Sequence, residues 1–258
     1  MNTMKEFHSF FGWFIQLARF YFNTGFWRLT VGVVSLALSK VFQVLTFFIP
    51  LKLFIIMSSE RMPHYMRFLS ELFSFSRDEL IFLLSISVGV FYVFYIALGI
   101  VYRRTVDAHF QRLELEDSCL GGVKLSQRAL VKMHGRCIAA VSDLILIGFS
   151  MLAVFIVNGG MALLWVSIVY LNMIFFFNAV FLKCKEDRIS FLRLKHNQFI
   201  DYFASANFLL IFGLLVFQAG YMGLGLFSAI FLLLLSRMLF RALSSFSVNG
   251  LYIYKLIV

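Results

Sequence analysis

The stretch FQAGYMGLGLFSAIF, from Phe217 to Phe231, holds three glycines and no charged residue within a long apolar region. It is either one helix weakened by glycine or the place where the chain reverses direction. Glycine adopts turn conformations at little steric cost, so both interpretations fit the local sequence. They give different numbers of helices and place the C-terminal residues on opposite sides, so this stretch decides the fold.

The composition places the chain in a membrane. Of its 258 residues, 61% are hydrophobic and only 14% are charged, whereas soluble domains keep about 25% charged. The length allows several spanning helices and leaves no room for a large soluble domain. The net charge is +10. In a membrane protein such an excess of basic residues indicates cytoplasmic loops that face anionic lipid. We therefore expect the lipid bilayer, and no nucleic acid, as a partner.

Residues 1–26 form the first predicted segment. Phe7, Phe10, Phe14 and Tyr21 recur at helical spacing, with polar residues on the other side. This pattern predicts an amphipathic helix that lies in the membrane interface, although a ragged start to the first span is the alternative. No cleavable signal peptide is evident, because the N-terminus lacks an apolar run that ends at a small-residue cleavage site.

A spanning helix needs roughly 20 mainly apolar residues, and the sequence offers six such segments. They are 28–57, 79–102, 137–157, 161–182, 203–219 and 222–244. The prediction is an all-α polytopic protein with a six-helix domain over 27–250. Cytoplasmic loops are expected at 103–136 and 183–202, and a short C-terminal tail at 251–258. Between the third and fourth spans only Asn158–Gly160 remain, which predicts a tight turn.

The distribution of Lys and Arg distinguishes the two interpretations of the glycine stretch. If it is a turn, 18 of the 23 basic residues fall on the side of both termini and only three on the other side, with Lys40 and Lys52 inside the first span. Six crossings with both termini in the cytoplasm therefore satisfy the positive-inside rule. A single helix over 203–244 would be about twice the necessary length, so we predict a turn.

The sequence contains no motif for catalysis. There is no GxSxG, HExxH or phosphate-binding loop, and no pair of carboxylates inside the predicted spans. The three cysteines fit no metal-binding spacing and are expected to be reduced. We expect neither an enzyme nor a metal site. We also expect no cofactor in this chain.

A stripe of small and polar residues runs along the first predicted span at intervals of three and four residues. Its members are Gly32, Ser35, Ser39, Gln43, Thr46 and Pro50. The stripe predicts either a helix-packing face or one wall of a hydrated substrate pathway. Lys40 lies about 18 Å of helix beyond Arg28, where an ammonium group is costly unless it is paired or hydrated. Asp143, in the third span, is its predicted partner.

The order of these segments resembles the transmembrane domain of exporter-type ABC transporters. FQVLTFFIPLKLFI (42–55) is similar to that family's first helix, which often ends near a proline. FGLLVFQAGYMGLGLFSAIFLLL (212–234) is similar to its junction between helices five and six, where Gly220 and Gly225 flank a short outer turn. An acidic residue usually follows the second glycine in the family, whereas this chain has Leu226.

The resemblance implies a permease that works with separate partners. The chain shows no nucleotide-binding domain, so ATP would bind to a separately encoded ABC ATPase. A second copy or a paralogue of this chain would complete a dimer in the plasma membrane, expected to be the bacterial inner membrane. The resemblance also implies a segment that couples the chain to the ATPase. It would lie in the loop after span two, with the residues Glu114, Glu116, Asp117, Gly121 and Gly122. The loop after span four is shorter than in the family.

Two functions therefore follow as expectations. One is the permease subunit of an ABC-type export complex, which moves an apolar, anionic or amphipathic substrate by alternating access. In this case Ser35, Ser39, Lys40, Gln43, Thr46 and Asp143 are candidate pathway residues. The other is a non-transporting membrane scaffold of an envelope or secretion complex, derived from the same fold.

Overall fold

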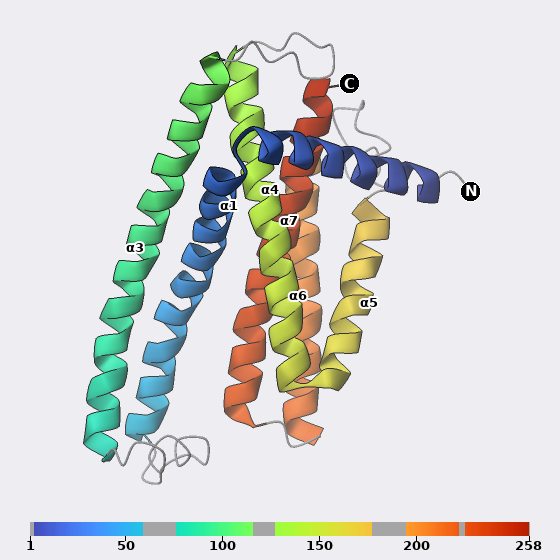
Figure 1. The fold of residues 1–258 in the computed structure, drawn as a ribbon. Coiled ribbons are helices and arrows are strands. Elements are labelled where there is room, and N and C mark those ends of the chain that lie inside the picture. The colour runs from blue at the N-terminus through green and yellow to red at the C-terminus, as the bar shows by residue number, and fades with distance from the viewer. Residues whose placement is uncertain (1–2, 59–75, 116–126, 177–194, 222–224, 258) are drawn as a thin grey trace. The chain divides into compact units, whose positions relative to one another are not determined.

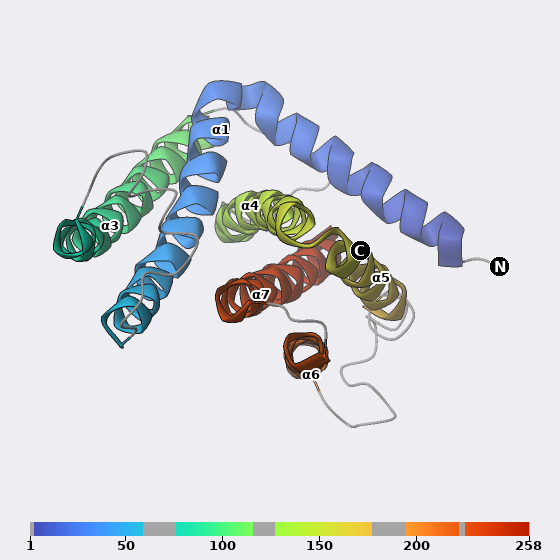
Figure 2. The same cartoon turned by 90° about the horizontal axis from the view of Figure 1, so that it is seen from below.

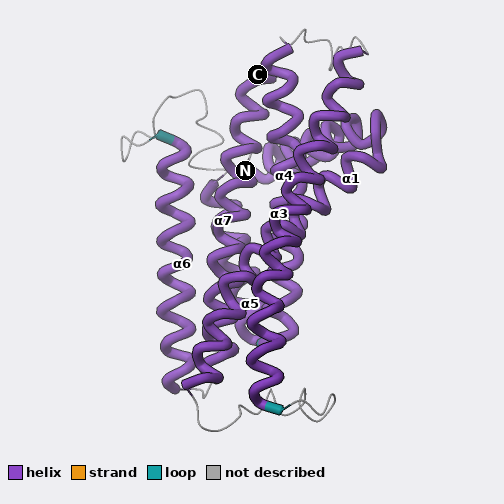
Figure 3. The backbone as a smooth tube through the Cα atoms, turned by 90° about the vertical axis from the view of Figure 1, so that its left-hand side faces the viewer, coloured by secondary structure: helices purple, strands orange, loops and turns teal. Residues whose placement is uncertain are grey.

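The computed structural model describes residues 3–58, 76–115, 127–176, 195–221 and 225–257, and all regular structure in them is helical, with no strand (Figure 3). The helices are α1 (Thr3–Ser58), α3 (Arg77–Leu115), α4 (Gln127–Val157), α5 (Gly159–Phe176), α6 (His196–Tyr221) and α7 (Leu226–Ile257) (Figure 1). Six segments of these helices are long and apolar enough to cross a membrane. The predicted all-α, multi-pass class is therefore confirmed.

The glycine stretch joins two helices. α6 ends at Tyr221, one residue beyond Gly220, and α7 begins at Leu226, directly after Gly225. The two helices run in opposite directions (Figure 1). The prediction of separate fifth and sixth helices is confirmed.

Local side-chain chemistry fixes two other helix starts. At α3, the Ser76 amide donates to Glu79 Oε2 at 2.7 Å and the Glu79 amide donates to Ser76 Oγ at 3.3 Å. This reciprocal pair is a capping box, which the sequence Ser-Arg-Asp-Glu encodes. Between α4 and α5, Asn158 Oδ1 accepts a hydrogen bond from the Met161 amide at 3.2 Å. Asn158 is thus the N-cap of α5 and makes the turn after α4 a single residue long.

The helices extend beyond the apolar segments that predicted them. Residues 103–115 and 127–136 are helical and shorten the expected loop over 103–136. Residues 196–202 belong to α6, and residues 251–257 of the expected tail belong to α7. Hydropathy marks only the apolar part of a helix, whereas Arg, Gln, Glu and Leu continue it readily outside that part. Residues 3–26 are the first part of α1, which bends sharply in its dark-blue region (Figure 1).

The chain divides into two compact units, 38–101 and 1–37 with 102–258. The first unit, hereafter the hairpin unit, holds the C-terminal part of α1 and the N-terminal part of α3. Phe42 of α1 lies against Phe91 and Phe94 of α3, with 5.4 Å between ring centroids in both pairs. Near the connection, Ile56 and Leu80 form a small buried cluster. Apolar contacts therefore hold this helix pair together along its length.

The second unit, hereafter the bundle unit, is organised around α7. This helix packs against α4 and α6, and α4 also packs against α5. Figure 2 shows α7 lying between α4 and α6. Over half of the apolar segment of α7, 56%, is buried, compared with 22% for α6. The outer helices expose large apolar side chains such as Leu163, Leu171 and Phe217, and these surfaces suit contact with lipid.

Candidate functional site

The small and polar stripe of α1 packs against α3. Ser35 and Ser39 are both buried. The Ser39 hydroxyl donates to the Tyr95 carbonyl at 3.1 Å, and a Cβ atom on Gly99 would lie 4.0 Å from the same hydroxyl. Small side chains on both helices therefore allow the close approach that is common between membrane helices.

The rest of the stripe is less uniform. Thr46 donates to the Phe42 carbonyl of its own helix at 2.8 Å. Gln43 is exposed, and Lys40, which follows Ser39 in the chain but is not part of the stripe, is half-buried. Two of the predicted pathway hydroxyls, those of Ser39 and Thr46, thus bond to backbone carbonyls. These bonds favour the packing interpretation for Ser39 and Thr46. Gln43 is the exposed polar residue of the stripe.

Asp143 is fully buried on α4, next to the equally buried Ser142. Lys40 belongs to the hairpin unit and Asp143 to the bundle unit. The Lys40–Asp143 pair therefore stays a prediction. Asp143 is buried, and a buried carboxylate needs a hydrogen-bonding or oppositely charged partner.

The predicted coupling segment lies almost entirely outside the described residues. Glu114 is in the last turn of α3, which ends at Leu115. Glu116, Asp117, Gly121 and Gly122 fall within 116–126, outside the described ranges. The coupling role of this segment stays a prediction.

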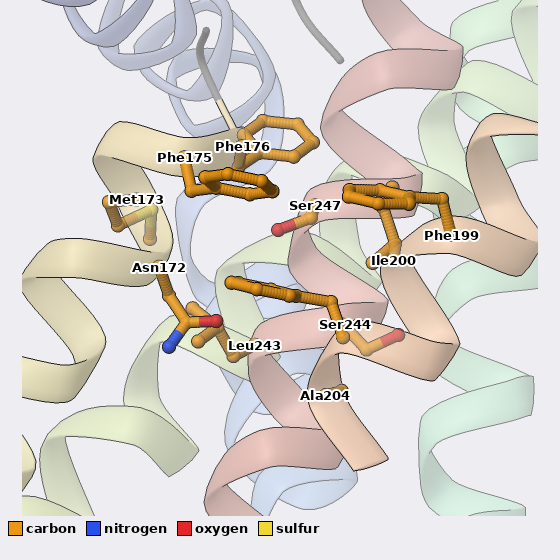
Figure 4. A pocket seen from close by; sticks show the side chains of 11 residues that line it. Asn172, Met173, Phe175, Phe176, Phe199, Ile200, Ala204, Leu243, Ser244 and Ser247 are labelled. Atoms are coloured by element: carbon orange, nitrogen blue, oxygen red, sulfur yellow. The ribbon is translucent and has the colours of Figure 1, made fainter. Parts of the chain in front are cut away.

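A pocket that the sequence did not predict lies between α5, α6 and α7 (Figure 4). Its lining residues are Asn172, Met173, Phe175, Phe176, Phe199, Ile200, Phe203, Ala204, Leu243, Ser244 and Ser247. Phe175 of α5 stacks on Phe203 and Phe199 of α6, with ring centroids 4.8 Å and 5.8 Å apart. The free volume of about 20 Å³ accommodates roughly one water molecule. The pocket is therefore a packing defect between helices, too small for an organic substrate.

Polar side chains near this pocket connect its three helices. Asn207 of α6 donates through Nδ2 to Asn172 Oδ1 of α5 at 2.7 Å, and Asn172 Nδ2 donates to the Ile168 carbonyl at 2.7 Å. Ser244 of α7 donates to Asp201 Oδ1 of α6, also at 2.7 Å. Hydrogen bonds of this kind hold membrane helices together in a fixed register.

Asp201 is a functional candidate that sequence reasoning missed. The fifth span was predicted to begin at residue 203, which left Asp201 in a loop. In the structure α6 begins at His196, so Asp201 lies inside a candidate membrane segment. Asp201 and Asp143 are thus both acidic residues within candidate spans. The sequence did contain an indication of this contact: polar residues recur on one face of 201–207, and serines recur over 244–247. Average hydropathy does not detect such a pattern.

A second pocket, of about 520 Å³, opens at the end of the bundle unit where α6 begins and α7 finishes. Its lining residues are Arg136, Lys195, His196, Asn197, Val248, Leu251, Tyr252 and Lys255. We call it the basic pocket. Three of its residues are lysine or arginine, and its volume lies in the range of small-molecule sites.

Over the described parts of the chain, no group of three or more His, Cys, Asp or Glu side chains is placed to hold a metal ion. Cys137 is buried and free, and Cys119 and Cys184 lie outside the described residues.

Comparison with models of known protein families, with curated proteins and with solved structures found no match to this chain.

Proposed function

We propose that the chain is the transmembrane permease subunit of an ABC-type export complex. It would move an apolar, anionic or amphipathic substrate by alternating access and work with a separately encoded ATPase. The observation that carries the proposal is the order of the six candidate spans and their connections. Very short connections follow the third and fifth spans, at Asn158 and at 222–225, and longer connections follow the second and fourth.

Charge supports the orientation of this subunit. The longer connections after α3 and α5, the helix ends that flank them and the ends of the chain together carry most of the Lys and Arg residues, which favours a cytoplasmic location for both termini. Residues 1–26 would then lie in the inner interface of the membrane as an amphipathic helix. The expected location is the bacterial inner membrane, with a second copy or a paralogue completing the transport unit.

The ATPase would bind at the longer connections. The proposed contact residues are Glu114, in the last turn of α3, and Glu116, Asp117, Gly121 and Gly122 in the first of these connections. ATP would bind to the partner subunit alone. In this arrangement the cytoplasmic extensions of α3 and α4 pass the motion of the ATPase to the membrane helices.

A second candidate function is a non-transporting membrane scaffold of an envelope or secretion complex. Two observations favour it. Hydroxyl groups of the predicted pathway, those of Ser39 and Thr46, bond to backbone carbonyls. The connection between α5 and α6, residues 177–195, is also short for a segment that must engage an ATPase.

The test is purification of the full chain from its native host in a mild detergent, followed by identification of the proteins that accompany it. The proposal predicts stoichiometric recovery of an ABC ATPase with measurable ATP hydrolysis. The double variant Glu116→Lys/Asp117→Lys should lose the ATPase, whereas Glu71→Lys, in the connection on the opposite side, should retain it. Reproducible recovery of a complex without a nucleotide-binding subunit would contradict the permease and favour the scaffold.

A further inference from the structure

The basic pocket continues into the one open face of α7. From Leu235 to Ile253 every residue of α7 is buried except five. These five are Arg237, Arg241, Ser245, Val248 and Tyr252. Their spacing of four, four, three and four residues places them on one side of the helix. Val248 and Tyr252 also line the basic pocket, so the face and the pocket form one continuous surface.

The two arginines lie deep in the candidate span. Arg237 and Arg241 are exposed within Ser228–Ile253, about 13 Å and 18 Å of helix from its nearer ends. In the predicted span over 222–244 both arginines would lie near its end, where a long side chain reaches the interface. In the structure the apolar segment continues to Ile253, so that explanation no longer holds. An exposed guanidinium at this depth requires water or an anionic partner.

The basic pocket concentrates positive charge at the end of this face. Arg136 comes from α4, Lys195 from the start of α6, and Lys255 from the end of α7. No carboxylate is among the lining side chains in the described part of the chain. The N-terminus of α6 adds the partial positive charge of the helix dipole. All of these contributions favour an anion.

Arg136 is held in a fixed position. Its Nη1 donates to Asn249 Oδ1 at 2.9 Å, and its guanidinium carbon lies 4.5 Å from the centroid of the Tyr252 ring. Asn249 Nδ2 in turn donates to Ser245 Oγ at 3.3 Å. A guanidinium has five N–H donors, and one hydrogen bond leaves several for a ligand. A planar, pre-oriented guanidinium matches the two oxygen atoms of a phosphate group.

We infer that the basic pocket binds the phosphate group of an anionic ligand, with Arg136 and Lys255 as its principal contacts. Arg237 and Arg241 extend the binding surface towards the middle of the membrane. Two kinds of ligand carry such a phosphate group. One is an anionic phospholipid, whose headgroup basic pockets between membrane helices often bind, and the other is a soluble phosphate ester. Binding at this site does not depend on transport or on an ATPase.

The experiment uses the purified full-length chain in two arms. In the first, the chain is placed in nanodiscs of phosphatidylcholine with or without phosphatidylglycerol, and the phosphatidylglycerol retained is measured by native mass spectrometry. In the second, inorganic phosphate and glycerol 3-phosphate are titrated against chloride at constant ionic strength, and thermal unfolding is measured. Retained phosphatidylglycerol identifies a lipid headgroup. A shift with the soluble phosphates alone identifies a soluble ligand.

The variants test whether binding occurs in the basic pocket. Lys255→Gln changes an exposed side chain and should weaken phosphate binding by roughly 10-fold, and Arg136→Gln by roughly 10- to 100-fold. Lys132→Gln is the matched control, because Lys132 is an exposed cation on α4 that does not line the pocket. Arg136→Lys keeps the charge and loses the planar fork, so its affinity should lie between those of the wild type and Arg136→Gln.

Two results would overturn the inference. One is the absence of a phosphate-dependent signal in both arms. The other is unchanged binding in both Lys255→Gln and Arg136→Gln. The thermal unfolding of each variant without ligand shows whether it is folded. If Arg136→Gln does not fold, Lys255→Gln alone decides, since its side chain has no hydrogen bond or ion pair within the described residues.

Discussion

The hydroxyl of Ser244 on α7 donates a hydrogen bond to Oδ1 of Asp201 on α6, with 2.7 Å between the two oxygen atoms. Ser244 is buried, whereas Asp201 is exposed at the surface of the bundle unit. The bond therefore joins the central helix to an outer one. A carboxylate within an apolar segment is costly unless it is hydrogen-bonded or hydrated.

Loss of this bond should loosen the contact between α6 and α7. We expect Ser244→Ala and Asp201→Ala, each of which removes one partner of the bond, to lower the free energy of unfolding. In a double-mutant cycle they should show a coupling energy of about 0.6–1.7 kcal/mol, the range for side-chain hydrogen bonds between membrane helices. Unfolding of the detergent-solubilised chain in increasing denaturant measures this energy. Ser205→Ala is the control, since its exposed hydroxyl bonds, among the described residues, only to the Asp201 carbonyl of its own helix. Purely additive effects of the two changes would show that the bond contributes nothing.

Single cysteines should report the orientation of the chain. In a variant without native cysteines, Gly160→Cys and Gly225→Cys should react with a membrane-impermeant maleimide added outside intact cells. Lys195→Cys should react only after the cells are opened. All three positions are exposed, so the pattern depends on the side of the membrane. Labelling of Lys195→Cys and Gly225→Cys from the same side would contradict a membrane crossing by α6.

The predicted pair of Lys40 and Asp143 can be tested by charge exchange. We expect Lys40→Met and Asp143→Leu each to reduce the yield of folded protein, because each leaves the other charge in the membrane without its partner. The exchanged variant Lys40→Asp/Asp143→Lys should recover much of the loss. Size-exclusion chromatography of detergent extracts measures the folded fraction. Equal losses that add, with no recovery on exchange, would exclude the pair.

Gly32 should tolerate a methyl group and reject a larger side chain. A Cβ atom at this position would lie 3.7 Å from Thr105 Cγ2, an ordinary van der Waals distance. Gly32→Ala should therefore be neutral or stabilising. Gly32→Leu should destabilise the chain by about 1–3 kcal/mol, the usual range for overpacking. Thermal unfolding in detergent measures both.

Gly89 of α3 provides the control for these changes. A Cβ atom there meets no neighbour within 4 Å, and the position is exposed. Gly89→Leu should therefore have little effect on stability. A loss for Gly89→Leu as large as that for Gly32→Leu would show that glycine is needed for the backbone of these helices and not for the contact with Thr105.

The helices and the turns were predictable because their causes are local. Apolar length identifies each span, and Asn158 and Gly225 mark the two short connections by their own conformational preferences. The full lengths of α6 and α7 were less predictable, because polar residues continue a helix once neighbouring helices support it. As a result the sequence misplaced Asp201 in a loop and placed Arg241 at the end of a span.

The side-chain contacts of the candidate site depend on the register between helices. Arg136 and Asn249 are 113 positions apart in the chain, and no spacing in the sequence connects them. The five open positions of α7 likewise become visible only when the burial of their neighbours is known. The basic composition predicted an anionic environment for the chain as a whole, but did not identify where an anion would bind.

The burial of α7 has a consequence for how the protein is made. An arginine at the centre of a helix opposes insertion by the translocon by about 2.5–3.5 kcal/mol, whereas each Leu, Ile, Phe or Val contributes only about −0.3 to −0.6. Arg237, Arg241 and the serines of 244–247 therefore make α7 a weak insertion signal, although it is the helix on which the bundle unit is built. Its entry into the bilayer would depend on α4 and α6, which precede it in synthesis and pack against it. If α4 and α6 had not entered the bilayer by the time α7 was made, we expect that α7 would stay outside the membrane.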